Sequence, residues 1–201
     1  VTALNYLVKG HLIKTDLNKV LLDYETEQEL DQAIAEGKKN HKGQPVSKYE
    51  HLYYSCINSS FCILANISKN CAWLKSTLGQ ASYVVQTMIE LSRKRKETMD
   101  LDIDEGRIKI SNITTQKMCV FNGKFGGGGF LLSPLGVIND GLLDVSYVNR
   151  IISSMGIIDI TKQAENGGLQ NYYDFYNTYR AKTVKVINKS KRVSKSGEEL
   201  A

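Results

Sequence analysis

Proline is scarce in this sequence: two occur in 201 residues, and no Pro/Ser-rich stretch separates one part from another. We therefore expect no internal domain boundary and interpret residues 1–201 as a single domain. No apolar run reaches the roughly 18 residues that a membrane-spanning helix needs. The start carries no signal-peptide pattern and already reads as core sequence, so we expect a fragment or a processed product of an intracellular protein.

Cysteine pairs are also missing. The four cysteines are Cys56, Cys62, Cys71 and Cys119, without a CxxC pair or zinc-ligand spacing. Reduced, mostly buried thiols are expected. RNP, KH and helix-turn-helix patterns are missing too, and we expect no nucleic-acid partner. The net charge of +5 still suits an anionic neighbour such as a membrane surface.

Short strands separated by turns dominate the remaining pattern. The residues around Glu105-Gly106 predict a hairpin, and three segments have helical character. Many short strands with glycine turns predict a fold that is mainly β with a few helices (α+β), built as a β-sandwich. The predicted strands are 12–22, one or two in 49–65, 99–104, 107–113, 116–122, 129–133, 142–149, and a final hairpin of 182–188 with 191–195.

The strongest helical signal lies in residues 78–91, with Ser76 as the predicted N-cap and basic residues 93–96 at the end. Its apolar residues recur at helical spacing and predict one apolar face; they are Leu78, Ala81, Val84, Val85, Met88, Ile89 and Leu91. Residues 151–165 predict another helix. Residues 25–40 turn from acidic to basic, which predicts a short exposed helix or a loop insertion.

The most distinctive segment runs from Asn122 to Val145. Gly126–Gly129 remove four successive side chains, which favours a sharp bend or the close approach of another backbone. Pro134 fixes a turn, and Asp140-Gly141 offers a carboxylate at a second turn. The GxxxxGK[ST] pattern is missing, so the glycines do not predict a phosphate loop; by themselves they indicate a bulge or a tight sheet corner.

As a whole, this segment resembles the C-terminal domain of the diacylglycerol kinase, sphingosine kinase and bacterial lipid kinase family, which includes acylglycerol kinases. The matching features are Asn122, Gly127–Gly129, Pro134 and the turn Asp140–Asp144. The resemblance extends to Leu78–Tyr83, Thr15–Val20 and Arg180–Ile187. Residues 24–47 have no counterpart in the family and are interpreted as a surface insertion.

The resemblance implies a transfer of the ATP γ-phosphate to a lipid hydroxyl. Family members hold ATP through a Gly-Gly-Asp-Gly-Thr motif in an N-terminal domain, which would precede Val1. We expect this nucleotide-binding domain to be absent here and the chain to be inactive by itself. ATP would bind only if another domain or chain supplied its site.

The resemblance also implies two sets of site residues. Mg²⁺ is the expected cofactor, held by the carboxylate of Asp140 and the backbone oxygens of Val137 and Leu142; the alternative is that Asp140 only caps its own turn. Glu198 corresponds to a glutamate near the reacting hydroxyl and is the expected catalytic residue. Ser196 replaces the family's aspartate and Gly136 its small alanine, and the first change argues against activity.

Two functions follow as hypotheses. The chain is the lipid-binding half of an ATP-dependent lipid kinase, or it is a non-catalytic, kinase-derived subunit of a larger complex at a membrane, with the mitochondrion as the expected compartment. The expected partners are a lipid or membrane surface and a nucleotide-binding domain or other protein subunits. Residues 52–64 and 78–91 would line an acyl-chain cleft, or they form ordinary core. The basic run 93–96 would contact anionic headgroups, or it is a solvated helix end.

Overall fold

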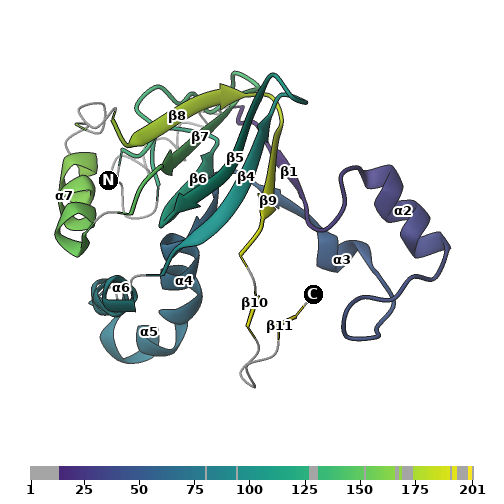
Figure 1. Cartoon of the computed structure of the whole chain (residues 1–201), viewed down its shortest axis with the longest axis horizontal. Coiled ribbons are helices and arrows are strands. Elements are labelled where there is room, and N and C mark those ends of the chain that lie inside the picture. The colour runs from purple at the N-terminus through teal and green to yellow at the C-terminus, as the bar shows by residue number, and fades with distance from the viewer. Residues whose placement is uncertain are drawn as a thin grey trace, which may run out of the picture. The chain divides into compact units, whose positions relative to one another are not determined.

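The structure is a computed structural model (Figure 1). It describes residues 14–79, 81–93, 95–126, 131–151, 153–165, 168, 174–190, 192–193 and 199–200. The chain forms two compact units, Val1–Cys56 and Ile57–Ala201. The interpretation of residues 1–201 as a single domain stays a prediction.

The first unit is an antiparallel pair of strands, and the segment that connects them is partly helical. β1 (Asn18–Leu21) pairs with β2 (Leu52–Ser55), and the chain between them forms α2 (Glu27–Ala35) and α3 (Lys48–His51). Thr26 caps α2, because its side chain accepts a hydrogen bond of 3.2 Å from the backbone N–H of Glu29. The helix expected within residues 25–40 is confirmed.

Within the described residues, the second unit has two larger antiparallel sheets and one further strand pair, and the predicted β-sandwich with a few helices is confirmed. The four-stranded sheet has the order β3-β6-β7-β8, and the three-stranded sheet has the order β5-β4-β9. In the first sheet the strands are β3 (Asn58–Cys62), β6 (Lys117–Phe121), β7 (Leu143–Val148) and β8 (Tyr176–Ala181). In the second they are β4 (Glu97–Ile103), β5 (Ile108–Thr115) and β9 (Val184–Asn188).

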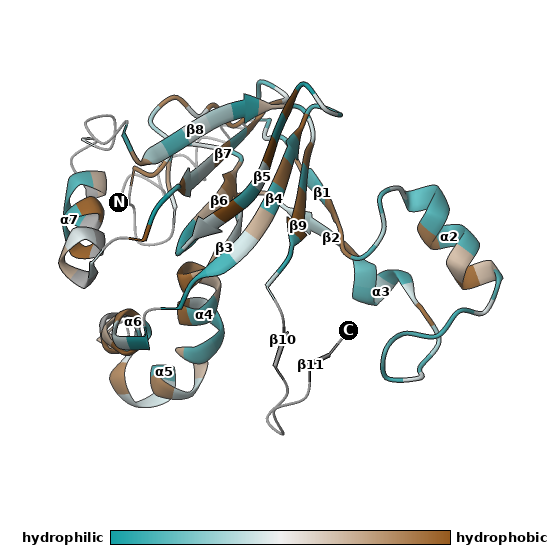
Figure 2. Cartoon of the chain, viewed as in Figure 1, coloured by the Kyte–Doolittle hydropathy of each residue, from teal (hydrophilic) through white to brown (hydrophobic). Residues whose placement is uncertain are grey.

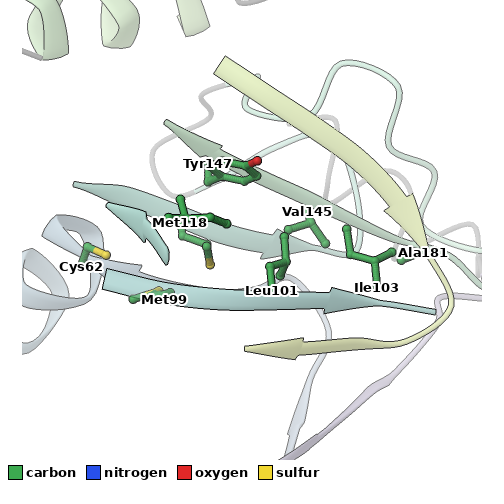
Figure 3. Close-up of a cluster of buried hydrophobic side chains, with 9 residues drawn as sticks. Cys62, Met99, Leu101, Ile103, Met118, Val145, Tyr147 and Ala181 are labelled. Atoms are coloured by element: carbon green, nitrogen blue, oxygen red, sulfur yellow. The ribbon is translucent and has the colours of Figure 1, made fainter. Parts of the chain in front are cut away.

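The main core gathers side chains from both sheets (Figure 3). Along β4, every second residue is buried, as expected for a strand with one face toward a core; these residues are Met99, Leu101 and Ile103. Val145 and Tyr147 of β7 join them from the other sheet. Figure 2 shows the same alternation of hydrophobic and hydrophilic residues along these strands.

In the part of the second unit that the structure describes there are four helices. α4 (Ile63–Asn70), α5 (Ala72–Leu78) and α6 (Ala81–Arg93) follow β3 in the chain and pack on one another. α7 (Ser154–Glu165) packs through Ile160 and Ala164 against Val148 and Tyr176 of the four-stranded sheet. Within the described residues, no helix has both the length and the apolar character to cross a membrane.

Two predicted boundaries are wrong near these helices. Ser76 lies inside α5 and does not cap a helix that begins near Leu78. The helix signal is divided at Gly79, whose φ of +53° is a left-handed conformation that ends α5 before α6 begins at Ala81. Residues 49–65 hold two strands as predicted, but the second one ends at Cys62 and α4 follows at once.

The predicted final hairpin is also wrong. β9 pairs with β4, and β10 (Arg192–Val193) pairs instead with β11 (Glu199–Leu200). By contrast, the hairpin around Glu105-Gly106 is confirmed by the antiparallel pair β4–β5. Three of the four free cysteines are buried, as expected: Cys62, Cys71 and Cys119.

Candidate functional site

The family-like segment folds as two loops at one end of the four-stranded sheet. The first loop leaves β6 at Asn122, and the second returns to β7 at Leu143. A bridge between Phe125 and Leu131 joins them, and the N–H of Ser133 donates to the carbonyl of Lys124 over 3.0 Å. Gly127–Gly129 lie outside the described residues.

Two glycines allow the loops to approach more closely than side chains would permit. A Cβ added to Gly136 would lie 2.6 Å from the carbonyl carbon of Gly123 and 3.0 Å from Oδ2 of Asp144. A Cβ on Gly123 would lie 2.7 Å from Cγ2 of Ile138. All three distances fall inside ordinary van der Waals contact. The loops therefore fit together because these two positions lack side chains.

Asp140 organises the acidic turn. Its Oδ1 accepts a hydrogen bond of 3.0 Å from the backbone N–H of Leu142, an Asx-turn that fixes the chain entering β7. Its Oδ2 forms an ion pair with Nη2 of Arg180. Both carboxylate oxygens are thus engaged within the protein.

Arg180 also contacts a second, buried carboxylate. Asp144 lies directly opposite Arg180 in the register of β7 and β8, and Oδ1 of Asp144 is 3.2 Å from Nε of Arg180. Asp144 is only 4% exposed, and its Oδ2 has no hydrogen-bond partner within the described structure. Burial raises the pKa of the Asp144 carboxyl, the charge of Arg180 lowers it, and Asp140 adds to the rise.

A second polar cluster anchors the loop to the sheet. The Tyr176 hydroxyl donates to the carbonyl of Leu132 over 3.0 Å, and it receives a hydrogen bond of 3.1 Å from Nζ of Lys117. Oγ of the buried Ser146 lies 3.1 Å from the same hydroxyl. Because Tyr176 also packs in the α7 cluster, the loop after the glycines is tied to both the sheet and α7.

The expected Mg²⁺ ligands lie on this turn. Asp140 supplies a carboxylate and Leu142 immediately precedes β7, while Val137 is exposed earlier in the second loop. Such oxygen donors suit a hard cation. A cation that bound Oδ2 of Asp140 would have to displace Arg180 from that atom. Across the described residues, no three or more His, Cys, Asp or Glu side chains are grouped to hold a metal ion, and the Mg²⁺ site stays a prediction.

Part of this site was predicted from the sequence. Glu198, the expected catalytic residue, lies outside the described residues, as does Ser196. The roles of Arg180 and Asp144 were missed, although both stand in segments that the family resemblance covers. A signal was available, because a carboxylate within an otherwise apolar predicted strand needs a partner when it is buried.

Comparison with known proteins assigns most of the chain to a family. Residues 60–201 match the family described as the YegS C-terminal NAD kinase beta sandwich-like domain. No curated protein sequence matches the chain significantly.

Among solved structures, the chain is similar to proteins of Bacillus anthracis str. Sterne described as diacylglycerol kinases, some of them provisionally. The first shares 17% identity at a TM-score of 0.49, covering 73% of this chain and 48% of that one. A second shares 17% identity at a TM-score of 0.45, covering 69% of this chain and 43% of that one. The chain therefore spans less than half the length of these structures. The family match covers most of the second unit and confirms the resemblance to a lipid kinase C-terminal domain: the chain belongs to the YegS C-terminal NAD kinase beta sandwich-like domain family.

Proposed function

We propose that this chain is the lipid-binding half of an ATP-dependent lipid kinase of the diacylglycerol, sphingosine or acylglycerol type, and that it is inactive by itself. The observation that carries the proposal is the interlocked loop pair of residues 122–145, in a domain that matches the family over residues 60–201. The loops present an acidic turn, paired with Arg180, at the end of the four-stranded sheet. A lipid hydroxyl and a phosphate donor would meet at such an end.

In this proposal the nucleotide comes from elsewhere. A separate domain or chain holds ATP, and Mg²⁺ bound near Asp140 would supply positive charge to this part of the kinase. Glu198 would accept the proton of the lipid hydroxyl. This chain contributes the lipid site and works at a membrane surface, with the mitochondrion as the proposed compartment.

A lipid-phosphorylation assay tests the proposal. The full chain is incubated with radiolabelled ATP, Mg²⁺ and micelles containing diacylglycerol, sphingosine or monoacylglycerol, alone and with a nucleotide-binding domain of a lipid kinase added in trans. We expect no labelled lipid from the chain alone and labelled lipid from the mixture, lost in the Glu198→Gln variant. Turnover by the chain alone refutes the claim that it is inactive by itself. Failure of both the mixture and direct lipid binding refutes the proposed function.

One observation favours the second function, a non-catalytic subunit of a larger membrane complex. Residues 14–56 fold as a strand pair with α2 between the strands, and this unit lies outside the family match. Its α2 carries a network in which Lys48 contacts Glu27 at 3.5 Å and Asp31 at 2.8 Å. If this is the function, the full chain co-purifies stoichiometrically with partner subunits and loses them when residues 24–47 are deleted, whereas Glu198→Gln has no effect.

A further inference from the structure

The helix α6 buries three polar side chains and exposes several apolar ones, which departs from the pattern of an ordinary surface helix. Its Leu91 is buried in the usual way, as are Leu74 of α5 and Ile67 of α4. On α6 the buried positions Ser82, Gln86 and Glu90 are polar and lie four residues apart. The sequence pattern predicted one apolar face on this helix, which would either line an acyl-chain cleft or form ordinary core. For Val85 and Met88 the second alternative is wrong, since both are exposed.

A hydrogen-bond network accounts for the buried polar side. Oε1 of Glu90 accepts from Nδ2 of Asn70 at 3.1 Å, from Nε2 of Gln86 at 2.9 Å and from Nη1 of Arg93 at 2.5 Å. Asn70 belongs to α4, so the network joins α4 to α6. Through Oε1 of Glu90 the network holds α6 against α4 with Gln86 and Glu90 inside, while Oε2 of Glu90 has no hydrogen-bond partner within the described residues.

The exposed residues of α5 and α6, two helices that pack on each other, are together called the α5–α6 surface. Trp73 is 69% exposed and Met88 is 54% exposed. The exposed positions Ala81, Val85, Met88 and Ser92 follow one stripe of α6 without a charged residue. The α5–α6 surface comprises Trp73, Lys75, Leu78, Ala81, Tyr83, Val85, Met88 and Ser92.

The same segment holds the net charge of the chain. Residues 63–96 contain six Lys and Arg against one carboxylate, the buried Glu90, and the rest of the chain holds twenty residues of each sign. The net charge of +5 therefore falls entirely within these helices and the residues that follow them. Lys75 lies beside Tyr83, with Nζ 5.0 Å from the ring centroid. Lys75 is thus a cation of the α5–α6 surface, and the single acid of the segment, Glu90, is buried.

We propose that the α5–α6 surface docks on an anionic lipid bilayer. Trp and Tyr favour the boundary between headgroups and acyl chains, apolar helix faces bury themselves there, and Lys and Arg bind anionic headgroups. An uncharged stripe would contribute little to nucleic-acid binding, where phosphate contacts dominate. The inference rests on the proposed function only in that a lipid substrate lies in a membrane, and it concerns a docking surface and not the substrate site.

The single tryptophan makes the test direct. Trp73 is the one tryptophan of the chain, so its fluorescence reports this surface alone. The full chain is titrated with vesicles of phosphatidylcholine, with or without phosphatidylserine, in the absence of ATP and lipid substrate. We expect emission at shorter wavelength, and quenching by brominated acyl chains, with phosphatidylserine vesicles. Both effects decrease at high salt.

Variants separate the apolar and electrostatic contributions. We expect Met88→Ser to lower the partition coefficient about tenfold through lost apolar burial, and Lys75→Gln about fivefold. Met155→Ser is the matched control, because Met155 is a comparably exposed methionine on α7, and it leaves binding unchanged. Circular dichroism establishes that each variant is folded.

Three results would overturn the docking proposal. These are unchanged Trp73 emission on vesicles, an equal loss in the Met155→Ser control, and a Trp73 shift caused by self-association or RNA but not by vesicles. A chain that binds diacylglycerol in micelles while Trp73 stays unchanged on vesicles refutes this surface and leaves the proposed function standing.

Discussion

Replacing Arg180 with methionine removes the cation that two carboxylates share. Arg180→Met keeps a long apolar side chain but leaves Asp144 ionised, buried and without its counter-ion, next to Asp140. Breaking a fully buried pair costs about 3–5 kcal/mol. Arg180 is 39% exposed at its side chain, so water screens part of this interaction. We expect a loss of about 2–3 kcal/mol in the free energy of unfolding.

Urea denaturation followed by circular dichroism measures this loss, which corresponds to a decrease in Tm of about 5–10 °C for a chain of this size. Asp144→Asn in the Arg180→Met background should recover more than half of it, because the uncompensated charge is then gone. Arg107→Met is the control. Arg107 pairs with Asp104 at the surface and donates to the backbone carbonyl of Arg180, but it does not contact the Arg180 side chain, and this change costs no more than about 1 kcal/mol. A cost of Arg180→Met no larger than the control, or no recovery in the double variant, would refute the reasoning.

Three further predictions concern the same unit. Gly136→Ala places a Cβ 2.6 Å from the backbone of Gly123, and we expect about 1–3 kcal/mol of destabilisation in urea; an unchanged midpoint would contradict the close approach of the loops. Met99→Ala empties a fully buried core position and should cost about 2–5 kcal/mol, whereas a cost near zero would place Met99 outside the core. Burial raises the pKa of the Asp144 carboxyl in the folded chain, so the neutral form of Asp144 favours folding. This contribution to the free energy of unfolding is complete below the pKa of the unfolded chain, and it is lost as the pH rises through the pKa of the folded chain. The stability of Asp144→Asn relative to the parent should therefore decrease as the pH falls from neutral toward 4, and an increase would give the pKa shift the opposite sign.

Short-range patterns explain which parts of the fold could be predicted. The β4–β5 hairpin was predictable because residues 104–106 adopt positive φ in a tight turn, a conformation that Gly106 tolerates easily. The segments that form β6 and β7 are rich enough in apolar residues to predict strands there, with bounds correct to within a few residues. Spacing within one segment determines these features, and no distant partner is required.

The partner of each element could not be predicted in the same way. β9 lies close in sequence to β10, yet it pairs with β4, because strand pairing depends on the registers and surfaces that distant strands offer. For α6 the apolar spacing correctly predicted a helix but not its buried face. The network of Glu90 with Asn70 and Arg93 turns the polar side inward.

The sequence by itself determined the family of this protein, its short strands and the acidic turn after the glycines, because these features depend on residue order and local backbone preference. Only the tertiary structure decided that Arg180 joins Asp140 to Asp144, and that α5 and α6 present apolar side chains outward. Both depend on contacts between segments far apart in the chain. Their free energy comes from burial and charge pairing, which no local pattern of residues specifies.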